Sequence, residues 1–159
     1  MDAPLEYGVA TAEELAGLDG LDFLRAVIAG RFPAPLIGRT MGFRLAEVGP
    51  GTAVFEGEPF DGLLNPLGSV HGGWALALID SAAGCAVHTE LPAGTGYTTV
   101  ETKVNFVRPI APEDGTVRCE GRVLSRGRQI ATAEARLLSA EGKLLAHGTS
   151  TLIILPAAR

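Results

Sequence analysis

The 159-residue chain lacks the features that mark several common protein classes. Its two cysteines, Cys85 and Cys119, are too few for a disulfide framework. No apolar run approaches the length of a membrane span, and residues 1–6 lack the basic start and apolar core of a secretory signal. We therefore expect a cytoplasmic protein with no membrane partner.

Positive charge and aromatic residues are also scarce. The formal net charge is −5, and lysines and arginines form no cluster of the kind that binds nucleic acid, so no nucleic-acid partner is expected. The three histidines lack paired spacing, so no metal site is expected. Aromatic residues make up only 6% of the chain, which predicts a mainly aliphatic core. The length fits one domain of ordinary size.

The most informative stretch begins as a polar, turn-rich loop at Asn65 and continues as an apolar segment from Gly72 to His88. That segment is too long for a typical strand and has apolar residues on every face, so it predicts a helix that is buried all round. Asp80 lies within it. An unpaired buried carboxylate would cost several kcal/mol, so Asp80 needs a partner or a chemical role.

Two glycines, Gly72 and Gly73, stand at the start of this helix. The first N–H groups of a helix have no partner within the helix and carry the positive end of its dipole. A helix start without side chains can therefore hold an anion or a developing oxyanion. Alternatively, the glycines only allow a tight turn or close packing.

The remaining pattern predicts an α+β fold. Thr11 and Glu14 have the spacing of a capping box, and residues 21–29 form a short amphipathic helix that Gly30 ends. Period-two alternation then predicts a hairpin over residues 43–58 and, after the long helix, strands over 97–108, 116–125, 129–139 and 144–154. This order indicates an antiparallel sheet wrapped around one helix.

The residues Asn65, His71-Gly72-Gly73 and Asp80 resemble the signature of hotdog-fold acyl-CoA thioesterases of the phenylacetyl-CoA (PaaI-like) group. Residues 98–109 resemble the strand that follows the central helix in that family. The resemblance implies a hotdog thioesterase domain over residues 41–159, preceded by an N-terminal helical extension over 1–40. It also implies an acyl-CoA substrate, no separate cofactor because coenzyme A is part of the substrate, and homodimers that usually pair into tetramers.

The same resemblance suggests roles for the residues of the site. Asp80 would act as general base or nucleophile, and the Gly72 N–H, helped by Gly73, would bind the oxyanion. Asn65 would orient water or bind the thioester, unless it is only a turn residue before Pro66. At His71 the resemblance implies a residue that supports the site without taking part in the chemistry. Alternatively, His71 is a loop histidine that only shapes the turn. The resemblance also implies that the hydroxyl of Thr99 lies near the catalytic carboxylate. Alternatively, Thr98 and Thr99 are only ordinary strand formers.

The spacing of Gly72 and Asp80 predicts how the site is assembled. Eight residues of helix span roughly 12 Å, which an aspartate side chain cannot cross. If both groups act on one carbonyl, they must come from different chains, as a two-fold dimer would arrange. We therefore expect a homodimer with two shared sites.

Other residues are candidates for substrate binding. The exposed turn Arg126-Gly127-Arg128 could pair with the phosphates of coenzyme A, or carry ordinary solvated charge. Trp74 could line the acyl pocket or lie in the core. Cys85 and His88 share a helix face, but a cysteine in an apolar helix is usually a core residue, so we do not expect a Cys-His nucleophile.

Two other functions remain open from the sequence. One is a hotdog enoyl-CoA hydratase or dehydratase, in which a catalytic histidine would pair with an acid in a different motif. The other is a non-catalytic acyl-CoA-binding sensor. Here the acid lies within the helix and the histidine precedes its start, which favours hydrolysis over hydration. A pure binder would give Asp80 no reason to be buried.

Overall fold

The computed structural model describes residues 5–156. Its helices are α1 (Ala12–Leu15), α2 (Gly20–Ile28), α3 (Leu36–Met41) and α4 (Gly72–His88), with short 3-10 turns η1 (Asp61–Leu63) and η2 (Pro112–Asp114). Its strands are β1 (Phe43–Gly49), β2 (Thr52–Gly57), β3 (Gly96–Phe106), β4 (Val117–Arg126), β5 (Ile130–Leu138) and β6 (Leu144–Leu155). Within these residues, no helix is long and apolar enough to cross a membrane.

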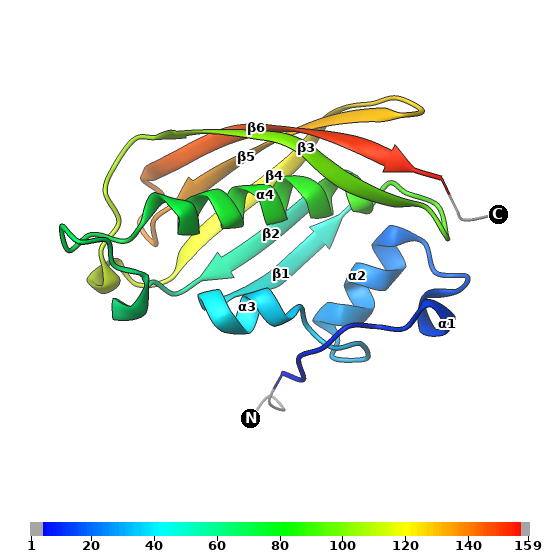
Figure 1. Cartoon of the computed structure of the whole chain (residues 1–159), viewed down its shortest axis with the longest axis horizontal. Coiled ribbons are helices and arrows are strands. Elements are labelled where there is room, and N and C mark those ends of the chain that lie inside the picture. Colours follow the sequence, from blue (N-terminus) through cyan, green and yellow to red (C-terminus); the bar gives the residue numbers. More distant parts are fainter. Residues whose placement is uncertain (1–4, 157–159) are drawn as a thin grey trace.

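The six strands form one antiparallel sheet in the order β1-β2-β4-β5-β6-β3. The sheet curves around α4, and α2 and α3 lie beside its β1 edge (Figure 1). The predicted α+β fold with a wrapped central helix is therefore confirmed. The strand β3, which follows α4, lies at the opposite edge of the sheet from β1.

One side of α4 packs tightly on the sheet. Leu78 and Ile79 are fully buried there. At Gly121 of β4, an added Cβ would lie only 2.3 Å from the carbonyl oxygen of Ala82, so the glycine permits this close approach. This contact fixes α4, and with it Asp80, relative to the strands.

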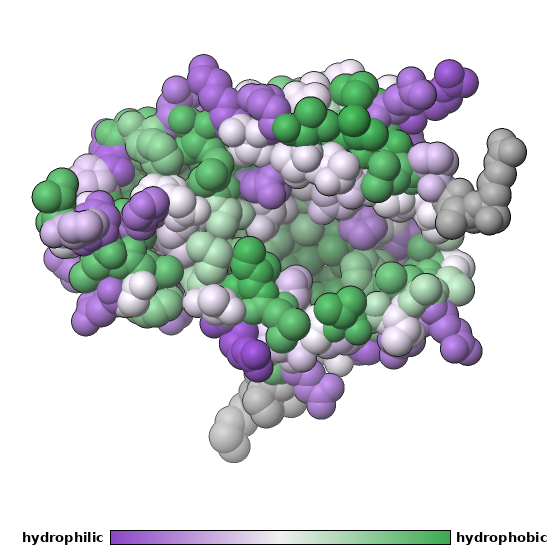
Figure 2. All heavy atoms as spheres, in the orientation of Figure 1, coloured by the Kyte–Doolittle hydropathy of each residue, from purple (hydrophilic) through white to green (hydrophobic). Residues whose placement is uncertain are grey.

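The other side of α4 is not fully covered, which differs from the expectation of a helix buried all round. Leu76 is 38% exposed, and half-buried residues continue the same stripe at helical spacing: Ala77, Asp80, Ser81, Cys85 and His88. We call these six residues the open stripe. Seen from the side of α4, the molecule has a hollow in which apolar residues are visible (Figure 2).

The N-terminal helices are fixed against the end of α4. The capping box predicted at Thr11 and Glu14 is confirmed by reciprocal hydrogen bonds. The Gly20 N–H donates to the Leu91 carbonyl at 3.0 Å. Helix α3 was not predicted, because the prolines before it indicated a break. A helix can nevertheless start directly after a proline, as α3 does after Pro35.

The sheet face turned away from α4 carries alternating charges. Arginine–glutamate ion pairs connect β1, β2, β4 and β5 across it: Arg44–Glu56, Arg118–Glu47, Arg118–Glu120 and Arg122–Glu134. We call this set the charged outer face. Its side chains alternate with the buried residues that pack under α4, as expected for a sheet with one solvated side.

Candidate active site

Asp80 lies in the middle of α4 and faces β3. Its Oδ1 accepts hydrogen bonds from the hydroxyls of Thr99 at 3.0 Å and Thr102 at 2.9 Å. Its Oδ2 accepts none from residues 5–156, and no buried side-chain oxygen of those residues lacks a partner, so Oδ2 reaches the surface. Asp80 thus has one oxygen that is held by the fold and one that is open to a ligand.

Thr102 completes this contact, and sequence reasoning missed it. In a regular strand, residues three apart point to opposite faces, so Thr99 and Thr102 would not meet the same group. The register of β3 against β6 shifts between Thr99 and Glu101, and this bulge turns both hydroxyls inward. Ser150 of β6 lies 3.0 Å from the Thr102 hydroxyl and fixes it from behind. Thr98 is exposed.

At the start of α4 the two glycine N–H groups differ. His71 is the N-cap residue, and its Nδ1 accepts a hydrogen bond from the Gly73 N–H at 2.9 Å. Nδ1 is therefore unprotonated in this contact. The Gly72 N–H has no acceptor within the described part of the chain. Of the two candidate oxyanion donors, only Gly72 is available, while His71 shapes the helix start.

The Asn65 side chain is bonded within its own loop. Its Oδ1 accepts from the N–H of Leu67 at 2.8 Å, and its Nδ2 donates to the Ser69 hydroxyl at 2.8 Å. These are the contacts of a turn-forming asparagine. The second Nδ2 hydrogen is not used by any of these contacts.

Two other predicted groups lie apart from Asp80. Trp74 is 1% exposed, and its Nε1–H donates to the Met41 carbonyl at 2.7 Å, so it supports the start of α4 from within the core. Arg126 and Arg128 are exposed at the β4–β5 turn. The strand register aligns Ile130, which follows this turn, with Ile153 of β6, and Ile153 with Thr98 of β3. The arginine turn therefore emerges at the end of the sheet where β3 begins.

Cys85 and His88 both approach Tyr97 of β3. Burial raises the pKa of the Cys85 thiol to about 12, so the thiol stays protonated at neutral pH. Burial also lowers the pKa of His88, whose ring centroid lies 5.4 Å from that of Tyr97. A protonated thiol is a poor nucleophile, which agrees with the prediction that no Cys-His nucleophile is present.

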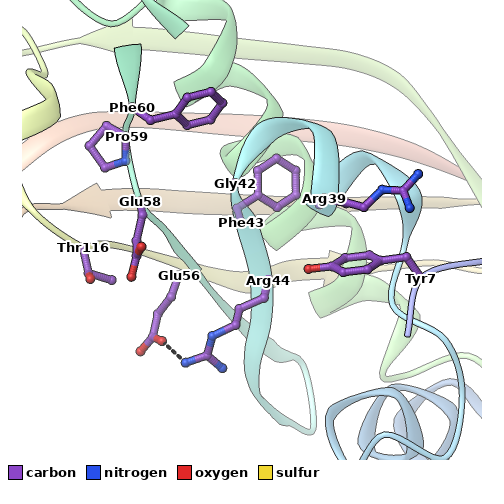
Figure 3. A pocket seen from close by; sticks show the side chains of 11 residues that line it. Tyr7, Arg39, Gly42, Phe43, Arg44, Glu56, Glu58, Pro59, Phe60 and Thr116 are labelled. Carbon is purple, nitrogen blue, oxygen red and sulfur yellow. Dashed lines mark hydrogen bonds and ion pairs between the residues drawn. The ribbon is translucent and has the colours of Figure 1, made fainter. Parts of the chain in front are cut away.

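A wide hollow lies away from these residues. It has a volume of about 550 Å³ and is located between α3 and the β1–β2 edge (Figure 3). Tyr7, Arg39 and Phe60 line it, together with the Arg44–Glu56 ion pair. None of the predicted site residues is among its walls. Within residues 5–156, no group of three or more His, Cys, Asp or Glu side chains could hold a metal ion.

The remaining geometry suits chemistry at a carbonyl group. A carboxylate with one fixed and one open oxygen can take a proton from water or attack an electrophilic carbon. A helix N–H without a partner can stabilise an oxyanion. Gly72 and Asp80 are eight residues apart on the same rigid helix, so one chain cannot bring both to a single carbonyl.

Comparison with known proteins places the chain in a family. The family model described as the thioesterase superfamily matches residues 67–146. None of the curated proteins compared with the chain matches it significantly. The chain therefore belongs to the thioesterase superfamily, and the family expected from its motifs is confirmed.

Solved structures show the same hotdog fold. A phenylacetic acid degradation-related protein from Ralstonia eutropha is 28% identical, with a TM-score of 0.75 over 82% of this chain and 98% of that chain. A conserved protein from Pseudomonas aeruginosa is 32% identical, with a TM-score of 0.71 over 76% and 94%. A variant of the phenylacetic acid degradation protein PaaI from Thermus thermophilus is 30% identical, with a TM-score of 0.66 over 74% and 96%.

Proposed function

We propose that this protein hydrolyses acyl-CoA thioesters to a free acid and coenzyme A. The observation that carries the proposal is the state of Asp80, whose Oδ1 is held by two hydroxyls while Oδ2 remains open. Membership of the thioesterase superfamily supports the same reaction. Two solved relatives at 28–30% identity are named for phenylacetic acid degradation, which makes arylacetyl thioesters sensible first substrates.

The proposed site is shared by two chains. The Gly72 N–H of one chain would bind the carbonyl oxygen, and Asp80 of the other chain would act on the carbonyl carbon. Leu76 lies midway between Gly72 and Asp80 on α4, so an antiparallel pair of helices would place the two Leu76 side chains at the two-fold axis. The open stripe, with Leu76 38% exposed, supports such a partner.

Asp80 has two possible roles in the reaction. As a general base, it would take a proton from water while the water oxygen attacks the carbonyl carbon. The C–S bond would then break, and the proton would pass to the leaving thiolate. As a nucleophile, it would form a mixed anhydride as the C–S bond breaks and coenzyme A leaves as a thiolate. Water would then cleave the anhydride to the free acid and restore the Asp80 carboxylate, and the proton lost from this water would pass to the thiolate. In both routes the Gly72 N–H stabilises the oxyanion, and the second Nδ2 hydrogen of Asn65 is available to orient water or substrate.

The Arg126-Gly127-Arg128 turn is the proposed contact for the phosphates of coenzyme A. Both arginines are exposed. The turn joins β4 to β5 at the end of the sheet where β3 begins, and β6 lies between β5 and β3. Guanidinium groups pair well with phosphate oxygens. His71 would keep the helix start in place and would not act as a general base, because its Nδ1 is occupied by the Gly73 N–H.

The deciding experiment is thiol release from a panel of acyl-CoAs by the wild type and by Asp80→Asn. The asparagine oxygen can still accept from both threonines, so the variant should fold. We expect its turnover to fall by about 100-fold or more, the usual range for loss of a general base or nucleophile. Equal turnover would remove Asp80 from the chemistry and make His71 the next candidate. Binding without turnover by the wild type would favour a sensor or a hydratase.

A second pair of variants tests the oxyanion donor. Gly72→Pro removes the N–H at the first helical position, where proline is well tolerated, and the extended backbone of His71 suits a following proline. Gly72→Ala keeps the N–H and adds a methyl group about 3.0 Å from the Phe106 ring. We expect about a 100-fold loss with proline and a smaller loss with alanine. Equal losses would assign the effect to crowding at Phe106.

A further inference from the structure

The open stripe of α4 ends against the ring of Tyr97. We call this ring, together with Cys85 and His88 beside it, the Tyr97 wall. Tyr97 lies two residues before Thr99 on β3, and both side chains face α4. An added Cβ on Gly84 would lie 3.0 Å from both Cε2 and Oη of Tyr97, so the ring occupies the space that a side chain at position 84 would fill. Gly84 is one helical turn beyond Asp80. The Tyr97 ring therefore stands roughly 6 Å along the helix from the carboxylate.

The Tyr97 ring is supported from behind by the N-terminal extension. The His88 ring lies 5.4 Å from the Tyr97 ring, and the Phe23 ring of α2 lies 5.7 Å from the His88 ring. Phe32 continues the row at 5.7 Å from Phe23. These four rings connect the extension to β3, the strand whose threonines bind Asp80.

The wall is uncharged on the side that faces Asp80. Burial raises the pKa of the Tyr97 hydroxyl and of the Cys85 thiol, and the charge of Asp80 raises both further. Burial lowers the pKa of His88, which favours its neutral form. A protonated phenol, a protonated thiol and a neutral imidazole form a surface that accepts an apolar group.

The open stripe runs in two directions from Asp80. From Asp80 toward Leu76, the stripe leads to the two-fold axis of the proposed dimer, where the partner helix would cover it. From Asp80 toward His88, it leads to the Tyr97 wall. The acyl group is the apolar end of the substrate and suits the Tyr97 ring, which faces α4. The charged coenzyme A end must remain near solvent, and the exposed arginine turn lies at the same end of the sheet but two positions away from β3 in the strand order.

We infer that Tyr97, supported by His88 and Phe23, determines the longest acyl group that the site accepts. This inference rests on the proposed thioesterase function and extends it to a specificity-determining residue. Because the wall stands about one helical turn from Asp80, the wild type should prefer short or compact acyl groups over long straight chains.

A cavity beyond the wall makes the inference testable. It has a volume of about 360 Å³ and lies between the N-terminal helices and the loop after α4. Its walls include residues of both segments and of the aromatic row: Leu15, Leu18, Phe23, His88, Pro92 and Gly96. Removal of the Tyr97 ring would extend the acyl site toward this cavity.

The experiment measures kcat/KM for straight-chain acyl-CoAs from acetyl to dodecanoyl. With Tyr97→Ala, we expect the ratio of decanoyl-CoA to butyryl-CoA hydrolysis to rise at least tenfold. Phe23→Ala, which lies in the extension and cannot touch the reacting carbonyl, should change the ratio in the same direction by less. Tyr97→Phe keeps the ring and should leave the ratio unchanged.

The outcomes separate this inference from the proposed function. If the wild type hydrolyses no thioester, both fail together. If turnover depends on Asp80 but Tyr97→Ala leaves the chain-length profile unchanged, only the inference about Tyr97 is overturned. Should Tyr97→Ala not fold, Tyr97→Leu replaces it, because leucine keeps an apolar contact while removing most of the ring.

Discussion

Thr102 donates a hydrogen bond to the same Asp80 oxygen that accepts one from Thr99, and a bulge in β3 makes the double contact possible. The pair leaves Oδ2 as the only Asp80 oxygen that is free for a ligand. The strand therefore orients the carboxylate before any substrate arrives, which is the kind of support that precise catalytic geometry requires.

Thr102→Val should lower kcat without a comparable change in KM. A hydrogen bond to a charged group contributes about 1.5–3 kcal/mol, which corresponds to roughly a tenfold or greater loss if the carboxylate turns away from the carbonyl. Steady-state kinetics with one acyl-CoA measure the effect. Thr98→Val is the matched control, since Thr98 is exposed on the same strand, and it should behave as the wild type. Equal kcat values in both variants would contradict a positioning role for Thr102.

Mixing two inactive variants should restore activity. In a dimer of one Asp80→Asn chain with one Gly72→Pro chain, one site keeps an intact Asp80 and an intact Gly72 N–H. Random pairing of equal amounts should recover about a quarter of the wild-type rate, because half of the dimers are mixed and each has one working site. The rate is measured after the chains are refolded together. If each chain forms its own site, the mixture stays inactive.

Leu76→Cys should form a disulfide between two chains. The proposed two-fold axis passes by residue 76, which would bring the two new thiols within reach of a bond. Oxidation followed by a non-reducing gel detects the linked dimer. Leu67→Cys is the control. Leu67 is 93% exposed, so a thiol there is more accessible than one at position 76, but it lies in the loop before α4 and away from the proposed axis. Equal cross-linking at both positions would show that exposure, not the proposed axis, decides the result.

His88 should make stability depend on pH. Burial lowers its pKa in the folded protein below the ordinary value, so the unfolded chain binds the proton more readily. Its contribution to the free energy of unfolding is therefore complete above the unfolded pKa of about 6.5 and decreases as the pH falls below it. Urea unfolding at about pH 7.5 and 5.5 measures the difference.

His88→Phe keeps a ring between Phe23 and Tyr97 and should reduce this pH difference. His147→Phe, at an exposed histidine of β6, serves as the control and should leave the difference as in the wild type. If His88→Phe loses as much stability in acid as the wild type does, the pH dependence comes from other groups.

Local patterns predicted much of the fold and part of the site. The apolar run around Asp80 predicted α4, and the Thr11–Glu14 spacing predicted the capping box of α1. The position of Thr99 near Asp80 came from the family resemblance. Thr102 could not be found in the same way, because a bulge reverses the strand alternation and leaves no clear mark in the sequence.

Contacts between distant segments account for the rest. The apolar pattern of α4 cannot distinguish a face covered by its own sheet from one left for another chain, so the open stripe was missed. The place of Tyr97 opposite Gly84 depends on how β3 lies over the helix, which no short-range pattern encodes. Asn65 and Trp74 matched expected motifs, but their contacts emerge only from the folded loop and core.

The charged outer face has a consequence for higher assembly. A second dimer that packed against it would have to bring arginine–glutamate pairs out of water, and the loss of their hydration opposes such packing. The proposed contact through Leu76 is apolar and does not carry that cost. The two sides of the sheet would therefore favour different degrees of assembly: pairing through α4, which would complete both sites, is easier than the back-to-back packing of two such dimers.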